Sequence, residues 1–166
     1  MHSIAVNENG DKATRYRELL PQIRSLIEGE TDMTANLANV AAALKEAMEF
    51  FWVGFYLVKD TPSGEHQLVL GPFQGPVACT RICYGRGVCG TAWKSGKSVV
   101  VEDVEQFPGH IACSSLSRSE IVVPLQSEER GIVGVLDIDS TETGTFDEVD
   151  REYLEMLCRI ICESVK

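Results

Sequence analysis

Two neighbouring strand-like segments restrict the fold of this chain more than any other feature. Residues 120–125 (EIVVPL) and 131–139 (GIVGVLDID) are rich in β-branched residues and are joined by a short polar turn around residues 127–131. Such a pair is typical of a β-hairpin. A second hairpin is predicted upstream, where the strand-like FFWVGFYLVK and HQLVL flank the turn DTPSG. We therefore expect a largely antiparallel sheet.

Helical patterns lie on both sides of these strands. Apolar residues recur at helical spacing from Tyr16 to Ile27, although Pro21 interrupts the pattern and predicts a kink or a helix start nearby. Thr31 or Asp32 can cap a second helix, and a terminal amphipathic helix is expected to begin within residues 145–147. We predict an α+β fold, with an antiparallel sheet flanked by helices, in one domain over residues 1–166. Its leading helices occupy about residues 11–48, and its sheet, active-site loops and terminal helix occupy about residues 51–166.

Charge and hydropathy narrow the possible partners. The net charge of −10 argues against nucleic acid and anionic membrane surfaces, because both would repel the protein. No apolar run approaches the roughly 20 residues of a membrane span. The first residues, MHSIAVNENGDK, lack the apolar stretch of a secretory signal, so we expect a cytoplasmic protein.

Six cysteines raise the question of what their thiols do. A zinc site would combine Cys79 and Cys83 with His110 and Cys113, but an i, i+4 pair on an extended strand spans about 13 Å, too far to share one ion. We therefore expect no metal. The ordinary alternative is a small buried hydrophobe. That interpretation is favoured for Cys83 and for the terminal-helix residues Cys158 and Cys162. It stays open for Cys79, Cys89 and Cys113, which lie among Gly, Pro and polar residues in the loop-rich segment 71–117.

Acidic residues mark one face of the second hairpin. Asp137 and Asp139 are two residues apart, so on a strand both point to the same face. If the turn is centred on Glu129 and Arg130, Glu120 comes opposite Asp139. Three carboxylates would then cluster near the loop that holds Cys113, share a proton and attract a cation. The alternative is a solvated strand end that enters the following turn.

Two further stretches carry weaker signals. Trp52 and Tyr56 lie on one face of the first strand, with Gly54 between them, and serve either as core residues or as pocket walls for an apolar or onium group. The glycines of GRGVCG permit a tight turn into a short helix over about residues 88–95. Its lack of a P-loop lysine argues against a nucleotide site.

Taken together, six segments resemble the free methionine-(R)-sulfoxide reductases, which are built on a GAF domain. The matching segments, in the family's order, are WVGFY, GPVACTRI, GRGVCGTA, VEDVEQFPGHIAC, SEIVVPL and GIVGVLDIDS. The resemblance implies that Cys113 is the nucleophile, Cys79 its main resolving partner and Cys89 a further redox-active thiol. It also implies that a substrate-binding set surrounds the amino acid: Trp52, Tyr56, Glu120, Asp137 and Asp139.

The resemblance further implies an activity and its partners. The substrate would be free methionine sulfoxide, the reductant a thioredoxin-like dithiol protein, and no cofactor would be needed. A homodimer formed through the helices is compatible with the fold. A GAF-type sensor without turnover is the alternative. Two positions depart from the family pattern: Ser114 stands where an aspartate is expected, and Cys83 adds a thiol where none is expected.

Overall fold

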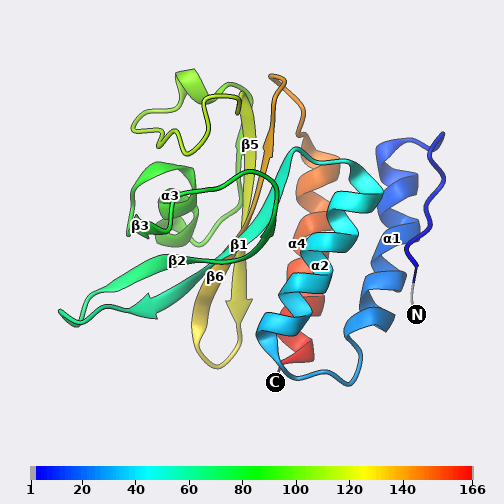
Figure 1. Ribbon diagram of the computed structural model, residues 1–166, viewed down its shortest axis with the longest axis horizontal. Helices are drawn as coiled ribbons and strands as arrows, with labels where there is room; N and C mark the ends of the chain where they lie inside the picture. The colour runs from blue at the N-terminus through cyan, green and yellow to red at the C-terminus, as the bar shows by residue number, and fades with distance from the viewer. Residues whose placement is uncertain (1–2, 166) are drawn as a thin grey trace.

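The sheet predicted from the two hairpins is present in the computed structural model, which describes residues 3–165 (Figure 1). Six strands form one antiparallel sheet in the order β3-β2-β1-β6-β5-β4. The elements in chain order are α1 Lys12–Ile27, α2 Met33–Met48, β1 Trp52–Asp60, β2 His66–Gln74, β3 Arg81–Cys83, α3 Gly87–Ser95, β4 Val99–Val101, the 3-10 turn η1 Val104–Gln106, β5 Ser119–Ser127, β6 Gly131–Ser140 and α4 Glu148–Ser164. The predicted α+β class is confirmed.

Both predicted hairpins form, and each supplies two strands of the sheet. β1 pairs with β2, and β5 pairs with β6. The link between the two hairpins is the pairing of β1 with β6, which places Trp52 opposite Asp139 and Gly54 opposite Asp137. β6 is therefore flanked by β1 and β5, and its side chains are surrounded from both sides.

Helices α1, α2 and α4 cover one face of the sheet (Figure 1). Asp147 caps α4 in a capping box with Asp150. Asp150 is buried, and it accepts hydrogen bonds of 2.6 Å from the Tyr16 hydroxyl and from Lys12 Nζ, which attach α4 to α1. α1 runs without interruption through the exposed Pro21, so no helix start occurs there.

The opposite face of the sheet carries α3 and the two long loops of residues 75–80 and 107–118 (Figure 1). Alternation along β6 sends Leu136 and Ile138 into the core under the helices, and Val135 into the smaller core under α3. Asp137 and Asp139 follow the same alternation as Val135. Within residues 3–165, no helix is long and apolar enough to cross a membrane.

Candidate active site

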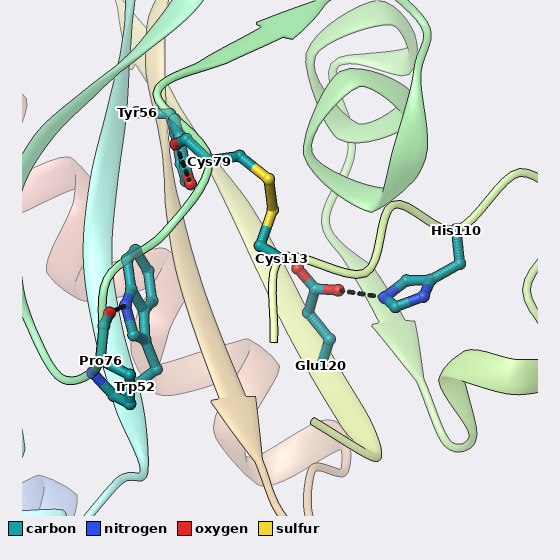
Figure 2. Close-up of a disulfide and its surroundings, with 7 residues drawn as sticks. All are labelled: Trp52, Tyr56, Pro76, Cys79, His110, Cys113 and Glu120. Atoms are coloured by element: carbon teal, nitrogen blue, oxygen red, sulfur yellow. Dashed lines mark hydrogen bonds and ion pairs between the residues drawn. A yellow bond between two sulfur atoms is a disulfide. The ribbon is translucent and has the colours of Figure 1, made fainter. Parts of the chain in front are cut away.

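A disulfide between Cys79 and Cys113 joins the two long loops above the sheet (Figure 2). The two residues are 34 positions apart, and their Cα atoms are 5.4 Å apart. Cys79 precedes β3, while Cys113 lies in the loop between η1 and β5. Cys113 is exposed and Cys79 half-buried, so the bond lies at the mouth of a pocket.

Two aromatic residues of β1 hold the Cys79 loop in place. The Tyr56 hydroxyl donates a hydrogen bond of 2.9 Å to the carbonyl of Cys79, and Trp52 Nε1 donates one of 2.9 Å to the carbonyl of Pro76 (Figure 2). Burial, and then the charge of Asp137, raises the pKa of Tyr56, so this hydroxyl keeps its proton and remains a donor. Because both rings line the pocket, they serve as walls and as supports of the redox loop.

Gly54 makes room for the indole of Trp52. A Cβ atom at this position would lie 2.7 Å from the Trp52 ring and 2.4 Å from Cβ of Phe73. Trp52 stacks between Phe73, at a centroid distance of 5.3 Å, and Tyr56, at 6.1 Å. Only glycine lets the ring lie flat over the strand, which explains the spacing of WVGFY.

The three predicted carboxylates come together in the pocket beneath the disulfide. The β5–β6 hairpin places Glu120 opposite Asp139 as predicted, and Val122 opposite Asp137. The register does not come from a turn centred on Glu129 and Arg130: the turn pairs Ser127 with Gly131, and a register shift between Leu125 and Gln126 moves the pairing by one residue. Glu120 and Asp137 are buried, and Asp139 is half-buried. Burial raises the pKa of all three carboxyl groups, and the nearby charge of Asp137 raises those of Glu120 and Asp139 further. The interpretation as a solvated strand end is therefore wrong.

The carboxyl pair that shares a proton is Glu120 with Asp137. A hydrogen bond joins these two side chains; it raises the pKa of Glu120 and lowers that of Asp137. Asp139 raises the pKa of Glu120 only through its charge. Glu120 lies directly opposite Asp139 in the register, but its side chain reaches past that residue to Asp137, a diagonal neighbour on the same face.

Cys89 lies in the first turn of α3 and faces the same acids. Its thiol is buried and hydrogen-bonds to Asp137, while burial and the charges of Asp137 and Glu120 raise its pKa well above the ordinary value. Cys89 is thus a protonated thiol near neutral pH. Its ligand atom lies within 4.8 Å of those of Glu120 and Asp137. A metal bound there would have to displace the protons of Cys89 and Glu120.

The zinc ligand set considered from the sequence is not assembled. Cys79 and Cys113 are joined to each other, and Cys83 lies on the sheet edge at β3, where it accepts a hydrogen bond of 3.6 Å from Gln67 Nε2. Cys83 is exposed, so its prediction as a buried hydrophobe is wrong: side chains alternate along β3, and Ile82 takes the buried face while Cys83 takes the uncovered one. Cys158 and Cys162 are buried as predicted.

His110 and Ser114 flank the exposed cysteine. His110 Nε2 lies 3.8 Å from Glu120 Oε1 (Figure 2), and burial lowers the pKa of the imidazole, which is therefore neutral at pH 7. Ser114 Oγ accepts a hydrogen bond of 3.2 Å from the backbone N–H of Leu116. Serine thus makes the local turn that an aspartate would make there, without its negative charge.

Several residues of the pocket had not been identified from the sequence. They come from loops, from β3 and from the start of α3: Phe51, Val77, Ala78, Ile82, Arg86, Gly87, Val88, Ile111 and Ser117. Arg86 could have been identified from the sequence, because it is the only cation between the glycines of GRGVCG. The apolar residues of the pocket could not have been identified in this way, since their segments have no hydrophobic periodicity that would show which side chains face inward.

The buried acids make the pH dependence of stability testable. Because the folded-state pKa of Glu120 lies above its unfolded value, the folded protein binds more protons, and the free energy of unfolding falls as pH rises from about 4 through the folded pKa. Glu120→Gln should remove this contribution, which is up to about 1.4 kcal/mol per pH unit. Urea unfolding at pH 5 to 8 should therefore show a flatter decline in the variant than in the wild type.

The matched control for this measurement is Glu152→Gln on the exposed side of α4. It changes the same charge without a buried partner, so its pH dependence should follow that of the wild type. Parallel curves for Glu120→Gln and the wild type would mean that Glu120 is ionised in the folded protein at all these pH values.

Comparison with known proteins gives a consistent picture. The GAF domain family matches residues 30–162. The chain is 60% identical to GAF domain-containing protein A of Dictyostelium discoideum, over 92% of this chain and 93% of that protein. It is 47% identical to free methionine-R-sulfoxide reductase of Escherichia coli, over 89% and 86%. The crystal structure of free methionine-R-sulfoxide reductase from Neisseria meningitidis with its substrate superposes with a TM-score of 0.92 at 58% identity, covering 99% of this chain and 96% of that chain.

Proposed function

The chain belongs to the free methionine-R-sulfoxide reductase family of GAF domains, and we propose that it reduces free methionine-R-sulfoxide to methionine with thiols as the electron source. The observation that carries the proposal is the Cys79–Cys113 disulfide at the mouth of a pocket floored by three carboxyl groups. A small-ligand sensor needs a pocket without an accessible disulfide beside it, whereas a redox sensor with this disulfide would show no turnover.

The disulfide corresponds to the oxidised end of the proposed cycle. In the reduced protein, the Cys113 thiolate attacks the sulfoxide sulfur. The sulfoxide oxygen takes up one proton and passes to the Cys113 sulfur as the S–O bond of the substrate breaks; methionine leaves, and Cys113 becomes a sulfenic acid. The Cys79 thiol then displaces the sulfenic hydroxyl as water and forms the disulfide. A thioredoxin-like dithiol protein restores both thiols by exchange.

Glu120 is the proton donor that fits this step. Its pKa is raised by burial and by Asp137, which favours the protonated form inside the pocket. General acid catalysis needs such a group, protonated before the oxygen leaves and able to release the proton as charge develops. The neighbouring Asp137 carboxylate can accept the shared proton and return it.

The remaining charges of the pocket match a free amino acid. Asp137 has a buried oxygen, Oδ1, for which residues 3–165 provide no hydrogen-bond partner. With Asp139, it can receive the substrate ammonium group. Arg86 and the first N–H groups of α3 line the same pocket and offer a place for the substrate carboxylate. Trp52 and Tyr56 supply the apolar surface for the thioether end.

Turnover of free and acylated substrates tests the proposal. NADPH oxidation should be followed with thioredoxin and thioredoxin reductase, using free L-methionine-R-sulfoxide and its N-acetyl derivative. Acylation removes the ammonium charge, and each charged hydrogen bond lost should lower kcat/KM about ten- to a hundredfold. Equal kcat/KM values would refute the ammonium pocket. Binding without turnover under any reductant would establish the sensor instead.

Replacement of the resolving cysteine should separate the two halves of the cycle. Cys79→Ser is expected to release about one methionine per protein molecule and then to recycle poorly with thioredoxin, because the sulfenic acid on Cys113 has no partner. Dimedone labelling followed by peptide mass spectrometry should place the adduct on Cys113. Full thioredoxin-dependent turnover would show that Cys83 or Cys89 resolves equally well.

A further inference from the structure

The exposed large hydrophobic side chains gather at the disulfide. Within residues 3–165 there are four: Val77 is 88% exposed, Leu116 58%, Tyr84 55% and Ile111 39%. Tyr84 packs edge-on against Trp93. The other three lie within three residues of Cys79 or Cys113 in the sequence. Single exposed apolar residues are common on protein surfaces, whereas a group of three around a redox-active bond indicates a surface that binds a partner.

These three residues, Val77, Ile111 and Leu116, form what we name the disulfide rim. Val77, Ile111 and Cys113 line the mouth of one pocket. Ile111 packs against Gly87, where an added Cβ atom would lie 3.1 Å from its side chain. Leu116 is outside the pocket lining, so the rim extends beyond the surface that a substrate would touch.

Positive charge accompanies the rim on the Cys79 side. Arg81 and Arg86 are exposed, and neither forms an ion pair with a carboxylate in the described part of the chain. Arg86 lines the pocket together with Val77 and Ile111. Since the whole chain carries a net charge of −10, two exposed arginines beside the disulfide complement an acidic partner at this surface.

We propose that the disulfide rim is the docking surface for a thioredoxin-type dithiol protein, with an apolar border around its attacking cysteine and acidic residues that meet Arg81 and Arg86. The proposal rests on the proposed function, since only a catalytic disulfide must be reduced in every cycle. A small dithiol needs no such surface. A protein must bring its thiolate to the sulfur through a dry, complementary contact.

The exchange reaction that follows docking is balanced. The partner's thiolate forms a bond to the sulfur of Cys113, which is the exposed half of the disulfide, and the bond to Cys79 breaks and leaves a thiolate that takes up a proton. The second thiol of the partner then attacks the mixed disulfide. Cys113 is released reduced, and the partner leaves with its two sulfurs oxidised to a disulfide.

Leu116 permits the sharpest test because it does not line the substrate pocket. Leu116→Asp should lower kcat/KM for thioredoxin about tenfold, as expected for loss of an interface anchor. Its rate with dithiothreitol as the reductant should remain close to wild type. Leu116→Met keeps an apolar side chain at the rim and should retain the rate with thioredoxin.

A charge reversal tests the cationic border in the same assay. Arg81→Glu should lower kcat/KM for thioredoxin severalfold at low salt and weaken its dependence on ionic strength. Arg130→Glu is the matched control: it makes the same change in the β5–β6 turn, at the opposite end of the hairpin from Glu120 (Figure 1). Arg130→Glu should behave as wild type.

Three outcomes would overturn the docking proposal. Unchanged kcat/KM for thioredoxin in Leu116→Asp would remove the rim from recognition. An equal loss with dithiothreitol would place Leu116 in the catalytic step instead. A change from dimer to monomer on size-exclusion chromatography would make the rim a contact between copies of this chain. Absence of turnover in the wild type with both reductants is a different result, which refutes the proposed function.

Discussion

Cys113→Ser is expected to abolish methionine release with every reductant, including dithiothreitol, by at least about a thousandfold. In the proposed cycle, only the Cys113 sulfur forms a bond to the substrate, and a serine hydroxyl at neutral pH is neutral and a poor nucleophile. Single-turnover assays with reduced protein and free methionine-R-sulfoxide, with methionine quantified by mass spectrometry, would measure the effect directly. Residual activity above about a tenth of wild type would move the nucleophile to another thiol.

The structure provides a matched control for this variant. Both Cys113→Ser and Cys79→Ser lose the same disulfide, so any cost to stability from its loss is common to both. Only Cys113→Ser should lose the first turnover. Cys83→Ser, at the exposed edge of β3, should retain full activity with dithiothreitol.

Glu120→Gln should give the second large effect, a fall in kcat of about a hundredfold to ten thousandfold, the range typical of a lost general acid. The amide keeps the shape of the side chain but has no proton to release to the sulfoxide oxygen. In the wild type, kcat should decline as pH rises through the folded-state pKa of Glu120, because the acid form is lost. The variant should lack this alkaline limb in steady-state pH profiles.

Asp139→Asn serves as the comparison for Glu120→Gln. Asp139 lies on the same face and influences the shared proton only through its charge, so its replacement should mainly raise KM for the substrate ammonium. If both variants show the same increase in KM and an unchanged kcat, the carboxylates only bind the ammonium. The proton would then come from His110 or from water.

Much of the architecture could be predicted because it depends on local patterns. The period of two along the strand places Asp137 and Asp139 on one face, and the short turn around residues 127–131 predicts that β5 pairs with β6. The register in which Glu120 faces Asp139 also depends on the shift between Leu125 and Gln126, for which the sequence has no signal. The cap at Asp32 and the glycines before Cys89 likewise act on their own neighbours in the chain, so α2 and α3 begin where the sequence indicates. The sequence also carried the six segments that identified the family.

Long-range contacts could not be predicted from these patterns. The loops that hold Cys79 and Cys113 have no periodicity; Tyr56 and Trp52 of β1 hold the Cys79 loop by hydrogen bonds, and the disulfide joins it to the Cys113 loop. Cys83 is exposed because it lies on the face of β3 opposite to the buried Ile82, and only the tertiary structure shows that this face is uncovered.

The carboxyl groups of the pocket likewise owe one property to local order and another to tertiary structure. Local order along β6 determined by itself that Asp137 and Asp139 share one face, and the shifted pairing of β5 with β6 brought Glu120 to the same face. The closure of that face by α3 and the two loops decided that they are buried, and burial is what raises their pKa values. The reach of Glu120 across the sheet decided that its proton is shared with Asp137 and not with Asp139. Desolvation and side-chain reach depend on what covers a residue in three dimensions, and the order of residues along one strand does not contain that information.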